Sequence, residues 1–487
     1  MDRSQIDRRQ FLKQTAAATT AAAIVPAAAA TAAKPTKRPN VLYVFSDQHR
    51  ALSLPGEAFN QALAPNFDKF RHESLSMDNC ISNYPLCTPH RAILISGRYS
   101  CQTGIIHNGF PLKASEVGLG TTFANAGYHT GYIGKWHLSQ EGEGQAVPAG
   151  PLRFGFEHWY IWANTNKHYD DWTFDPVTGA RIDMPGYQPT RMTDQAIDFI
   201  NHQKNAEKPW FLVLSWNPPH PPFNPPDEEL KLYDDATLKL RPNVRLPTAA
   251  DKLTNPYPGL ESLEDLRKAE QGYYGGISAV DKEFARLLKT LEENGMSEDT
   301  VVIYTSDHGE MMGSHGHMAK QMPHEESCRV PFFVRWPGFK GRGEKSDALF
   351  ASVDIYPTLC GLAGIPVPQH CSGHDMSSLM HGDKKAHESE YVFLMNEKGP
   401  PTRQEVNVQT YRGVRTKTHT YAVQLDGRWC LYDNIADPYQ MKNLVKDPAQ
   451  RPLIDKLDAA LMAWMKSTGD TFPYATAIQS WSTYPGA

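Results

Sequence analysis

The sequence predicts an α/β protein: a large, mostly parallel sheet sandwiched by helices, with a smaller antiparallel sheet and a helix near the C-terminus. Short apolar runs rich in β-branched and aromatic residues occur at 41–45, 209–216 and 300–305, with helical stretches between them. Such runs are typical of buried parallel strands. After about residue 370 the runs shorten, alternate in polarity and are separated by turn residues such as Asp426-Gly427, which indicates antiparallel hairpins.

Chain length and charge narrow the functional classes. A chain of 487 residues can bury a large core and form more than one subdomain. The net charge of −5 gives no reason to expect nucleic-acid binding. The seven cysteines show no CxxC spacing, and their low density argues against a disulfide-built scaffold.

The N-terminal segment has the pattern of an export signal. Arg8-Arg9 and Phe11-Leu12-Lys13 are followed by an alanine-rich run to about Ala33. We therefore expect residues 1–33 to be a twin-arginine signal peptide, read by the twin-arginine export machinery, and the mature protein to be periplasmic or secreted. The alternative is an uncleaved alanine-rich helix or anchor. No stretch of the sequence is long and apolar enough to predict a transmembrane span.

The remaining chain divides into a predicted larger domain, 39–370, and a smaller C-terminal subdomain, 371–487. Residues 139 to 190 are rich in Gly, Pro, Asp and aromatics and are expected to be irregular. The predicted strands are 41–45, 128–133, 209–216, 300–305, 390–395, 408–415, 419–425 and 428–433. The predicted helices begin near 65 and 87 and cover about 121–127, 193–203, 262–295, 353–364 and 450–466.

Two of the buried strands end in side chains that bind cations. Asp47 and Gln48 follow the first strand, and Asp307 and His308 follow the strand at 300–305. The carboxyl ends of parallel strands meet at one edge of a sheet, so these side chains can converge on a single ion. Carboxylate and amide oxygens favour a hard cation, and we expect Ca²⁺ first and Mg²⁺ second.

Between these strands lies the run Cys87-Thr88-Pro89-His90-Arg91. Proline suits the first turn of a helix, so Cys87 is expected at a helix N-terminus, where free N–H groups favour an anion. Arg91 lies one helical turn further on and on the same face. Taken alone, the run is explained equally well by a buried cysteine at the start of an ordinary helix.

Further polar residues have side chains that can bind anions or transfer protons. Lys135 and His137 are two apart and point the same way on an extended segment, where the lysine can neutralise charge and the histidine can move a proton. His220 is held between prolines, although prolines also simply mark a loop. Candidates for substrate contact are Asn164, His168 and His317, which could equally be bland loop residues.

Together these residues resemble the sulfatase family over roughly residues 39 to 445. The resemblance is carried by the Cys-x-Pro-x-Arg run at Cys87, by Gly134-Lys135-Trp136-His137, and by the acidic strand ends. It implies an alkaline-phosphatase-like fold. It also implies that a formylglycine-generating enzyme oxidises Cys87 to formylglycine (3-oxoalanine).

The resemblance also assigns roles. Arg91, Lys135 and Lys320 would hold the sulfate with the metal, His137 would take up a proton, and His220 or Lys320 would assist the leaving alcohol. The metal ligands would be Asp47, Gln48, Asp307, His308 and the modified Cys87. Three positions depart from common family residues: His90 replaces Ser, Gln48 replaces Asp, and His308 replaces Asn.

The predicted function is a sulfuric ester hydrolase acting on sulfate esters, with sulfated carbohydrates favoured by the export signal and aryl sulfates also possible substrates. One alternative is a phosphodiester or phosphonate monoester hydrolase, because the same nucleophile can attack phosphorus. The other is a non-catalytic, calcium-dependent carbohydrate-binding protein. The complete set of reactive residues argues against the second alternative.

Overall fold

The computed structural model describes residues 37–139, 145–162, 165–248, 261–341, 343–398 and 409–473. The predicted signal peptide lies outside these ranges. Residues from Arg38 onward form one compact unit. The division of this unit at residue 370 stays a prediction.

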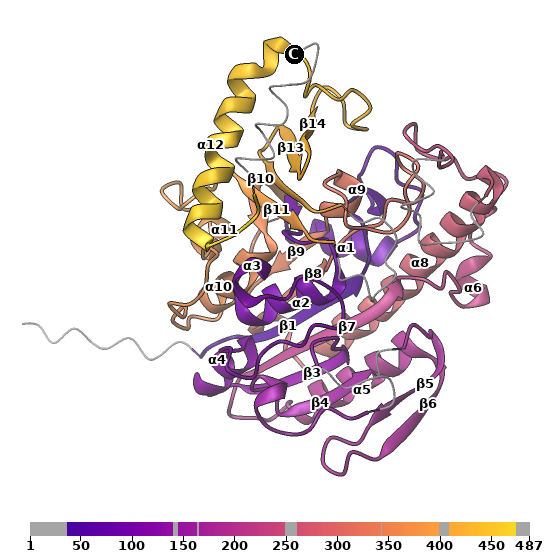
Figure 1. The fold of residues 1–487 in the computed structure, drawn as a ribbon. Helices are drawn as coiled ribbons and strands as arrows, with labels where there is room; N and C mark the ends of the chain where they lie inside the picture. The colour runs from indigo at the N-terminus through magenta and orange to yellow at the C-terminus, as the bar shows by residue number, and fades with distance from the viewer. Residues whose placement is uncertain are drawn as a thin grey trace, which may run out of the picture. The chain divides into compact units, whose positions relative to one another are not determined.

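The core of the unit is a ten-stranded mixed sheet with the order β10-β2-β9-β8-β1-β7-β3-β4-β5-β6 (Figure 1). The central strands β8, β1, β7, β3 and β4 are parallel to one another, and antiparallel strands flank them on both sides. The strands are β1 (Asn40–Asp47), β2 (Leu75–Ile81), β3 (His129–Lys135), β4 (His158–Trp162), β5 (Tyr169–Phe174), β6 (Arg181–Tyr187), β7 (Trp210–Pro219), β8 (Thr300–Ser306), β9 (Phe332–Arg335) and β10 (Glu344–Ala351).

Helices cover both faces of this sheet because its strands are apolar on both sides. In β1, Val41, Tyr43 and Phe45 point into one hydrophobic cluster, while Leu42 and Val44 point into another. The first cluster packs against α2 (Cys87–Ser96), α4 (Leu119–Asn125) and α10 (Ser352–Leu362). The second packs against α1 (Pro65–His72), α5 (Gln188–His202) and α8 (Leu263–Glu293).

A four-stranded antiparallel sheet and a long helix follow towards the C-terminus. The strands lie in sequence order and are β11 (Val392–Asn396), β12 (Tyr411–Arg415), β13 (His419–Gln424) and β14 (Gly427–Asp433). The helix α12 (Arg451–Thr468) packs on this sheet in a third hydrophobic cluster. The short helices are α3 (Ser100–Thr103), α6 (Asp227–Leu230), α9 (Glu325–Cys328) and α11 (Ser377–Met380), and the 3₁₀ turns are Ala51–Ser53, Pro151–Arg153, Ser297–Asp299 and Pro448–Gln450.

The predicted fold class is confirmed, and one part of the prediction is wrong. The stretch 139–190, expected to be irregular, contains β4, β5 and β6. Within its aromatic residues lies the buried strand β4, in which Trp159 and Ile161 pack into the core beside β3. The antiparallel β5–β6 hairpin extends the sheet, and its many Asp and Gly residues hide the strand pattern.

Strand register decides which side chains meet at the carboxyl edge of the sheet. Ser46 pairs with Ser306, so Asp47 and Asp307 both follow directly and lie side by side. Phe45 pairs with Ser215, which in turn pairs with Gly134. Lys135 therefore lies one residue beyond this row, at the carboxyl edge of the sheet. Gly134 has φ of +107°, and a Cβ there would lie 2.0 Å from the Ser215 carbonyl oxygen. Only glycine therefore allows β3 to deliver Lys135 to this edge.

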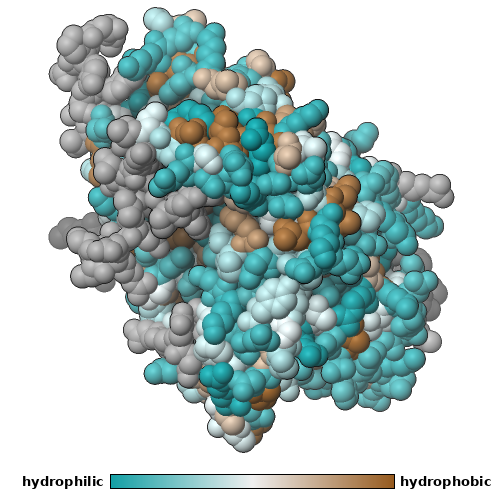
Figure 2. All heavy atoms as spheres, turned by 90° about the vertical axis from the view of Figure 1, so that its right-hand side faces the viewer, coloured by the Kyte–Doolittle hydropathy of each residue, from teal (hydrophilic) through white to brown (hydrophobic). Residues whose placement is uncertain are grey.

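Hydrophilic side chains predominate on the face of the protein that Figure 2 shows, where hydrophobic residues form small separate patches. Across the described ranges, no helix has both the length and the apolar character needed to cross a bilayer.

Candidate active site

Cys87 is the first residue of α2, as the sequence predicts. The helix begins after Leu86, whose carbonyl accepts a hydrogen bond from the His90 amide at 2.9 Å, and it ends at Gly97 in the left-handed conformation. The Thr88 amide, one of the free donors of this end, is bound by the side-chain oxygen of Asn108 at 3.0 Å. The Cys87 side chain is thus held, fully buried, at the electropositive end of a helix.

Arg91 ties together the two acidic strand ends. One guanidinium nitrogen, Nη2, lies 3.1 Å from Oδ2 of Asp47 and 3.0 Å from Oδ2 of Asp307. The other, Nη1, donates to the Lys135 carbonyl and to the Ser215 hydroxyl, both at 2.7 Å. All of its polar contacts are buried, so this side chain orients the carboxylates beneath Cys87.

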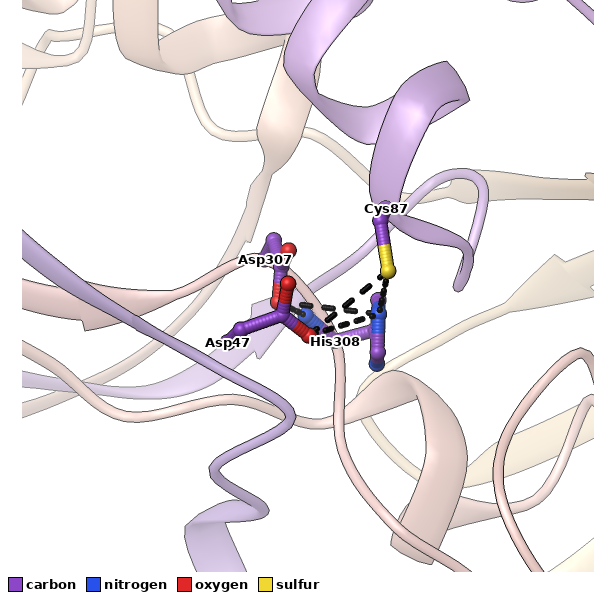
Figure 3. A group of neighbouring side chains, drawn as sticks. All are labelled: Asp47, Cys87, Asp307 and His308. Carbon is purple, nitrogen blue, oxygen red and sulfur yellow. Dashed lines mark hydrogen bonds and ion pairs between the residues drawn. The ribbon is translucent and has the colours of Figure 1, made fainter. Parts of the chain in front are cut away.

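The two carboxylates, Cys87 and His308 form a compact group of ligand atoms, all within 4.8 Å of one another (Figure 3). Cys87 Sγ lies 3.6 Å from Asp47 Oδ1 and 3.2 Å from His308 Nε2. His308 Nδ1 lies 3.0 Å from the Gly309 carbonyl oxygen and donates to it, so Nε2 faces the group and can bind a cation once it has lost its proton. Burial lowers the pKa of His308, but Asp307 and Cys87 outweigh it and raise that pKa above the ordinary value. This donor set suits a divalent cation.

Positive charge surrounds this group. Lys135 Nζ lies 2.6 Å from Asp47 Oδ2 and 3.8 Å from Cys87 Sγ, and it stacks on the Trp162 ring. Burial would raise the pKa of Asp47, but Lys135, with His308 and Arg91, holds it well below its usual value. Burial and Asp47 likewise raise the pKa of Cys87, yet Lys135, Lys320 and His308 outweigh them and lower it. The site therefore favours anions at position 87.

His137 and His220 lie at this edge as neutral imidazoles. Burial, followed by the charges of Lys135 and Lys320, lowers the pKa of each well below the ordinary histidine value. His137 Nδ1 is buried without a hydrogen-bond partner in the part of the chain that the structure describes. His220 Nδ1 donates to the Pro221 carbonyl at 2.6 Å, which leaves its Nε2 available.

Lys320 reaches the site from the loop after β8. Its Nζ donates to Oε1 of Gln48 at 2.5 Å, and the Gln48 Nε2 donates to the buried carboxylate of Glu310. Burial raises the pKa of Glu310, opposed by hydrogen bonds from two backbone amides. Gln48 and Lys320, predicted from distant segments, are therefore in direct contact.

Among the candidates for substrate contact, His168 lies close enough to Lys135 and Asp47 for their charges to affect its pKa. Its side chain lies near Asn224, four residues beyond His220. Burial lowers its pKa to about 4. His317 lies in the loop that carries Lys320, where its backbone carbonyl accepts from Gly313. Asn164 lies outside the described residues.

Sequence reasoning did not single out several residues that build this site. Ser215 and Asn108 fix Arg91 and the start of α2, and Glu310 binds Gln48. Only Glu310 had a visible signal, because it lies two residues after His308. Asn217, at the end of β7, is fully buried, and neither polar atom of its side chain has a partner among the described residues. His90, which replaces the common Ser, is buried between the hydroxyls of Ser82 and Ser352.

Comparison with known proteins now identifies the family. The sulfatase family model matches residues 39–365. The ulvan-active sulfatase of Formosa agariphila is 33% identical over 444 residues, which cover 90% of this chain and 83% of that protein. The chain belongs to the sulfatase family. This sulfatase is accordingly a sulfuric ester hydrolase, as the sequence predicts.

Further similarities support the fold of this sulfatase. Residues 313–467 match the C-terminal region of N-sulphoglucosamine sulphohydrolase. A Bacteroides thetaiotaomicron structure from work on the metabolism of multiple glycosaminoglycans has a TM-score of 0.80 and 26% identity, covering 91% of this chain and 99% of that chain. The phosphonate monoester hydrolase of Silicibacter pomeroyi has a TM-score of 0.74 at 22% identity, covering 89% and 96%. The last similarity concerns the fold alone.

Because buried imidazoles such as that of His168 resist protonation, we predict that the free energy of unfolding falls in acid. Above pH 6.5, the ordinary value, His168 is neutral in both the folded and the unfolded chain and its ionisation contributes nothing. Below it, only the unfolded chain takes up the proton until the pH reaches about 4, so stability falls across this window, by up to about 3 kcal/mol for this one group. In His168→Gln, the midpoint of thermal unfolding should fall less steeply between pH 6.5 and 4 than in the wild type. Parallel curves would contradict this assignment.

Proposed function

We propose that this sulfatase removes sulfate esters from sulfated carbohydrates, using a formylglycine made from Cys87 and a bound Ca²⁺, with Mg²⁺ as second choice. The observation that supports the proposal best is the position of Cys87. It is the first residue of α2, and its Sγ faces the carboxylates of Asp47 and Asp307 and the imidazole of His308. A nucleophile at a helix N-terminus beside a cation site suits attack on an anionic ester.

The residues present fit both the cation and the formylglycine. Asp47, Asp307 and His308, with the side chain of residue 87, would hold the cation, while the Gln48 amide oxygen, the other predicted ligand, faces the Lys320 ammonium. The mainly oxygen donor set is the basis for preferring Ca²⁺. When present, formylglycine supplies a hydrated aldehyde as the nucleophile, and the metal supplies positive charge beside it.

The charges at the site favour an anionic ester, and a bound divalent cation would add to them. Arg91 and Lys135 offset the two aspartates, and Lys320 adds a positive charge beside the neutral Gln48 oxygen. Lys135 and Lys320 would bind the sulfate oxygens and offset the charge that develops during reaction. The contacts of Arg91 support a role through the carboxylates rather than through the substrate.

The two histidines would move protons. His137 has an unpaired, buried Nδ1 and can accept a proton from the group at position 87. His220, or Lys320 near it, would deliver a proton to the departing alcohol. A bound anionic substrate would favour the protonated form of His220, which the free site disfavours.

The proposal includes the modification of Cys87 and the export of the protein. A formylglycine-generating enzyme would modify Cys87, and a twin-arginine signal at 1–33 would export the protein to the periplasm or beyond. Catalytic residues would lie in 39–370, followed by the subdomain 371–487. A carbohydrate substrate is also suggested by the relative named as ulvan-active.

The first test replaces the nucleophile. Cys87→Ala should abolish sulfate release while leaving the midpoint of thermal unfolding nearly unchanged, because the side chain supplies the reactive group and little packing. Cys101→Ala, a half-buried cysteine on α3, is the matched control and should retain activity. Mass spectrometry of the peptide around residue 87 should find aldehyde in active enzyme.

Two outcomes would refute this assignment: wild-type rates in Cys87→Ala, or an active enzyme whose residue 87 is entirely thiol. Assays with sulfate and phosphate esters of one leaving group belong beside this test, because phosphonate monoester hydrolases share the fold. A clear preference for the phosphate ester would favour the alternative function.

The second test concerns His168 as a sugar contact. Its Nε2 is buried without a partner among the described residues, and it lies near Asn224, which belongs to the same loop as His220. His168→Leu should lower kcat/KM for a sulfated saccharide about tenfold to a hundredfold, because a sugar hydroxyl loses its partner. Hydrolysis of 4-nitrophenyl sulfate, which has no such hydroxyl, should change less than about threefold.

His158→Leu is the matched control. His158 also has a buried, unpaired Nε2, but it begins β4 and so lies at the opposite edge of the sheet. Its replacement should leave the ratio of kcat/KM for the saccharide to kcat/KM for 4-nitrophenyl sulfate unchanged. An equal loss of kcat/KM on both substrates in His168→Leu would show that His168 does not contact the sugar.

A further inference from the structure

The backbone of Gln48 is fixed from both sides. It has φ of +71°, its amide donates to Asp307 Oδ1 at 3.0 Å, and its carbonyl accepts from the Tyr273 hydroxyl at 2.8 Å. The remaining freedom lies in the side-chain amide, whose oxygen and nitrogen exchange places if the group turns over. The neighbours of this amide therefore decide which atom faces the site.

Two neighbours of opposite character flank the amide. The ammonium of Lys320 can only donate, and it lies 2.5 Å from Oε1. The carboxylate of Glu310 accepts from Nε2 on the other side. Turning the amide over would bring two donors together at Lys320 and two acceptors together at Glu310.

Glu310 is itself immobilised. It is fully buried, and its Oε1 accepts from the amides of Met312 at 2.9 Å and Ala319 at 2.6 Å. These bonds close the loop that carries Lys320, and they leave Oε2 for Gln48. A buried carboxylate at this position thus acts on the amide and on the loop at once.

We propose that Glu310 is the positioning residue that sets the orientation of the Gln48 amide, and that the amide oxygen in turn holds the Lys320 ammonium at the nucleophile. The proposal rests on the proposed function, because it explains how one of the sulfate-binding lysines is placed. It also explains the pairing of a glutamine after β1 with a carboxylate after β8: an aspartate at position 48 would set two buried carboxylates against each other.

The test is a charge-swap cycle. In Glu310→Gln, Oε1 still accepts from both loop amides, but the new NH₂ group meets the NH₂ of Gln48. The amide turns over and presents a donor to Lys320, so kcat/KM for 4-nitrophenyl sulfate should fall about tenfold to a hundredfold. The midpoint of thermal unfolding should hardly change, because the loop remains fastened.

The swapped pair restores every hydrogen bond. Gln48→Glu alone opposes two carboxylates and should lose activity to a similar extent. In Gln48→Glu with Glu310→Gln, the new amide donates to the new carboxylate, which still accepts from Lys320. The double variant should therefore recover to within about fivefold of the wild type, well above the product of the two single losses.

A second cycle tests whether Glu310 acts through the lysine. In a Lys320→Met background, adding Glu310→Gln should cause no further loss of turnover. Glu283→Gln is the matched control: its buried carboxylate on α8 binds Thr190 and Arg286, and its replacement should leave turnover unchanged.

Calorimetry with inorganic sulfate gives a readout that does not depend on turnover. Glu310→Gln should bind sulfate about tenfold more weakly than the wild type, and the swapped pair should regain affinity. Equal sulfate affinity in the wild type and Glu310→Gln, or additive losses in the swapped pair, would overturn the inference. A wild type that binds sulfate but hydrolyses no sulfate ester would refute the proposed function instead, with the affinity pattern still deciding the role of Glu310.

Discussion

The site depends on one buried guanidinium. Arg91 Nη2 lies about equally far from the carboxylates of Asp47 and Asp307, which end two adjacent parallel strands from distant parts of the chain. Two carboxylates at this spacing would repel each other without a cation, and burial removes the water that would screen them. Since α2 supplies both Arg91 and Cys87, the element that fixes the acidic pair also aims the Cys87 side chain at it.

Much of this arrangement was predictable from local patterns. The apolar runs of β1 and β8 end in acidic residues, and the rule that ligands gather at the carboxyl edge of parallel strands places Asp47 beside Asp307. Pro89 and the spacing to Arg91 correctly placed Cys87 at the start of a helix. These predictions succeeded because each depends on a short-range rule of strand or helix geometry.

The errors and omissions arose where structure depends on contacts between distant segments. The β5–β6 hairpin was not expected, because its strands gain stability by extending an existing sheet rather than from their own alternation. Ser215 contacts Arg91 only through the register of β1, β7 and β3. The chain from Glu310 through Gln48 to Lys320 likewise joins three segments, so no single stretch of sequence shows it.

The central claim is that the aspartates held by Arg91 form a cation site at residue 87. A crystal structure of the enzyme grown with Ca²⁺ tests it most directly. We predict one strong ion peak about 2.3–2.6 Å from oxygens of Asp47 and Asp307, with the side chain of residue 87 in the coordination sphere of the ion. An ion bound away from these carboxylates, or a fully occupied ion that does not touch residue 87, would contradict it.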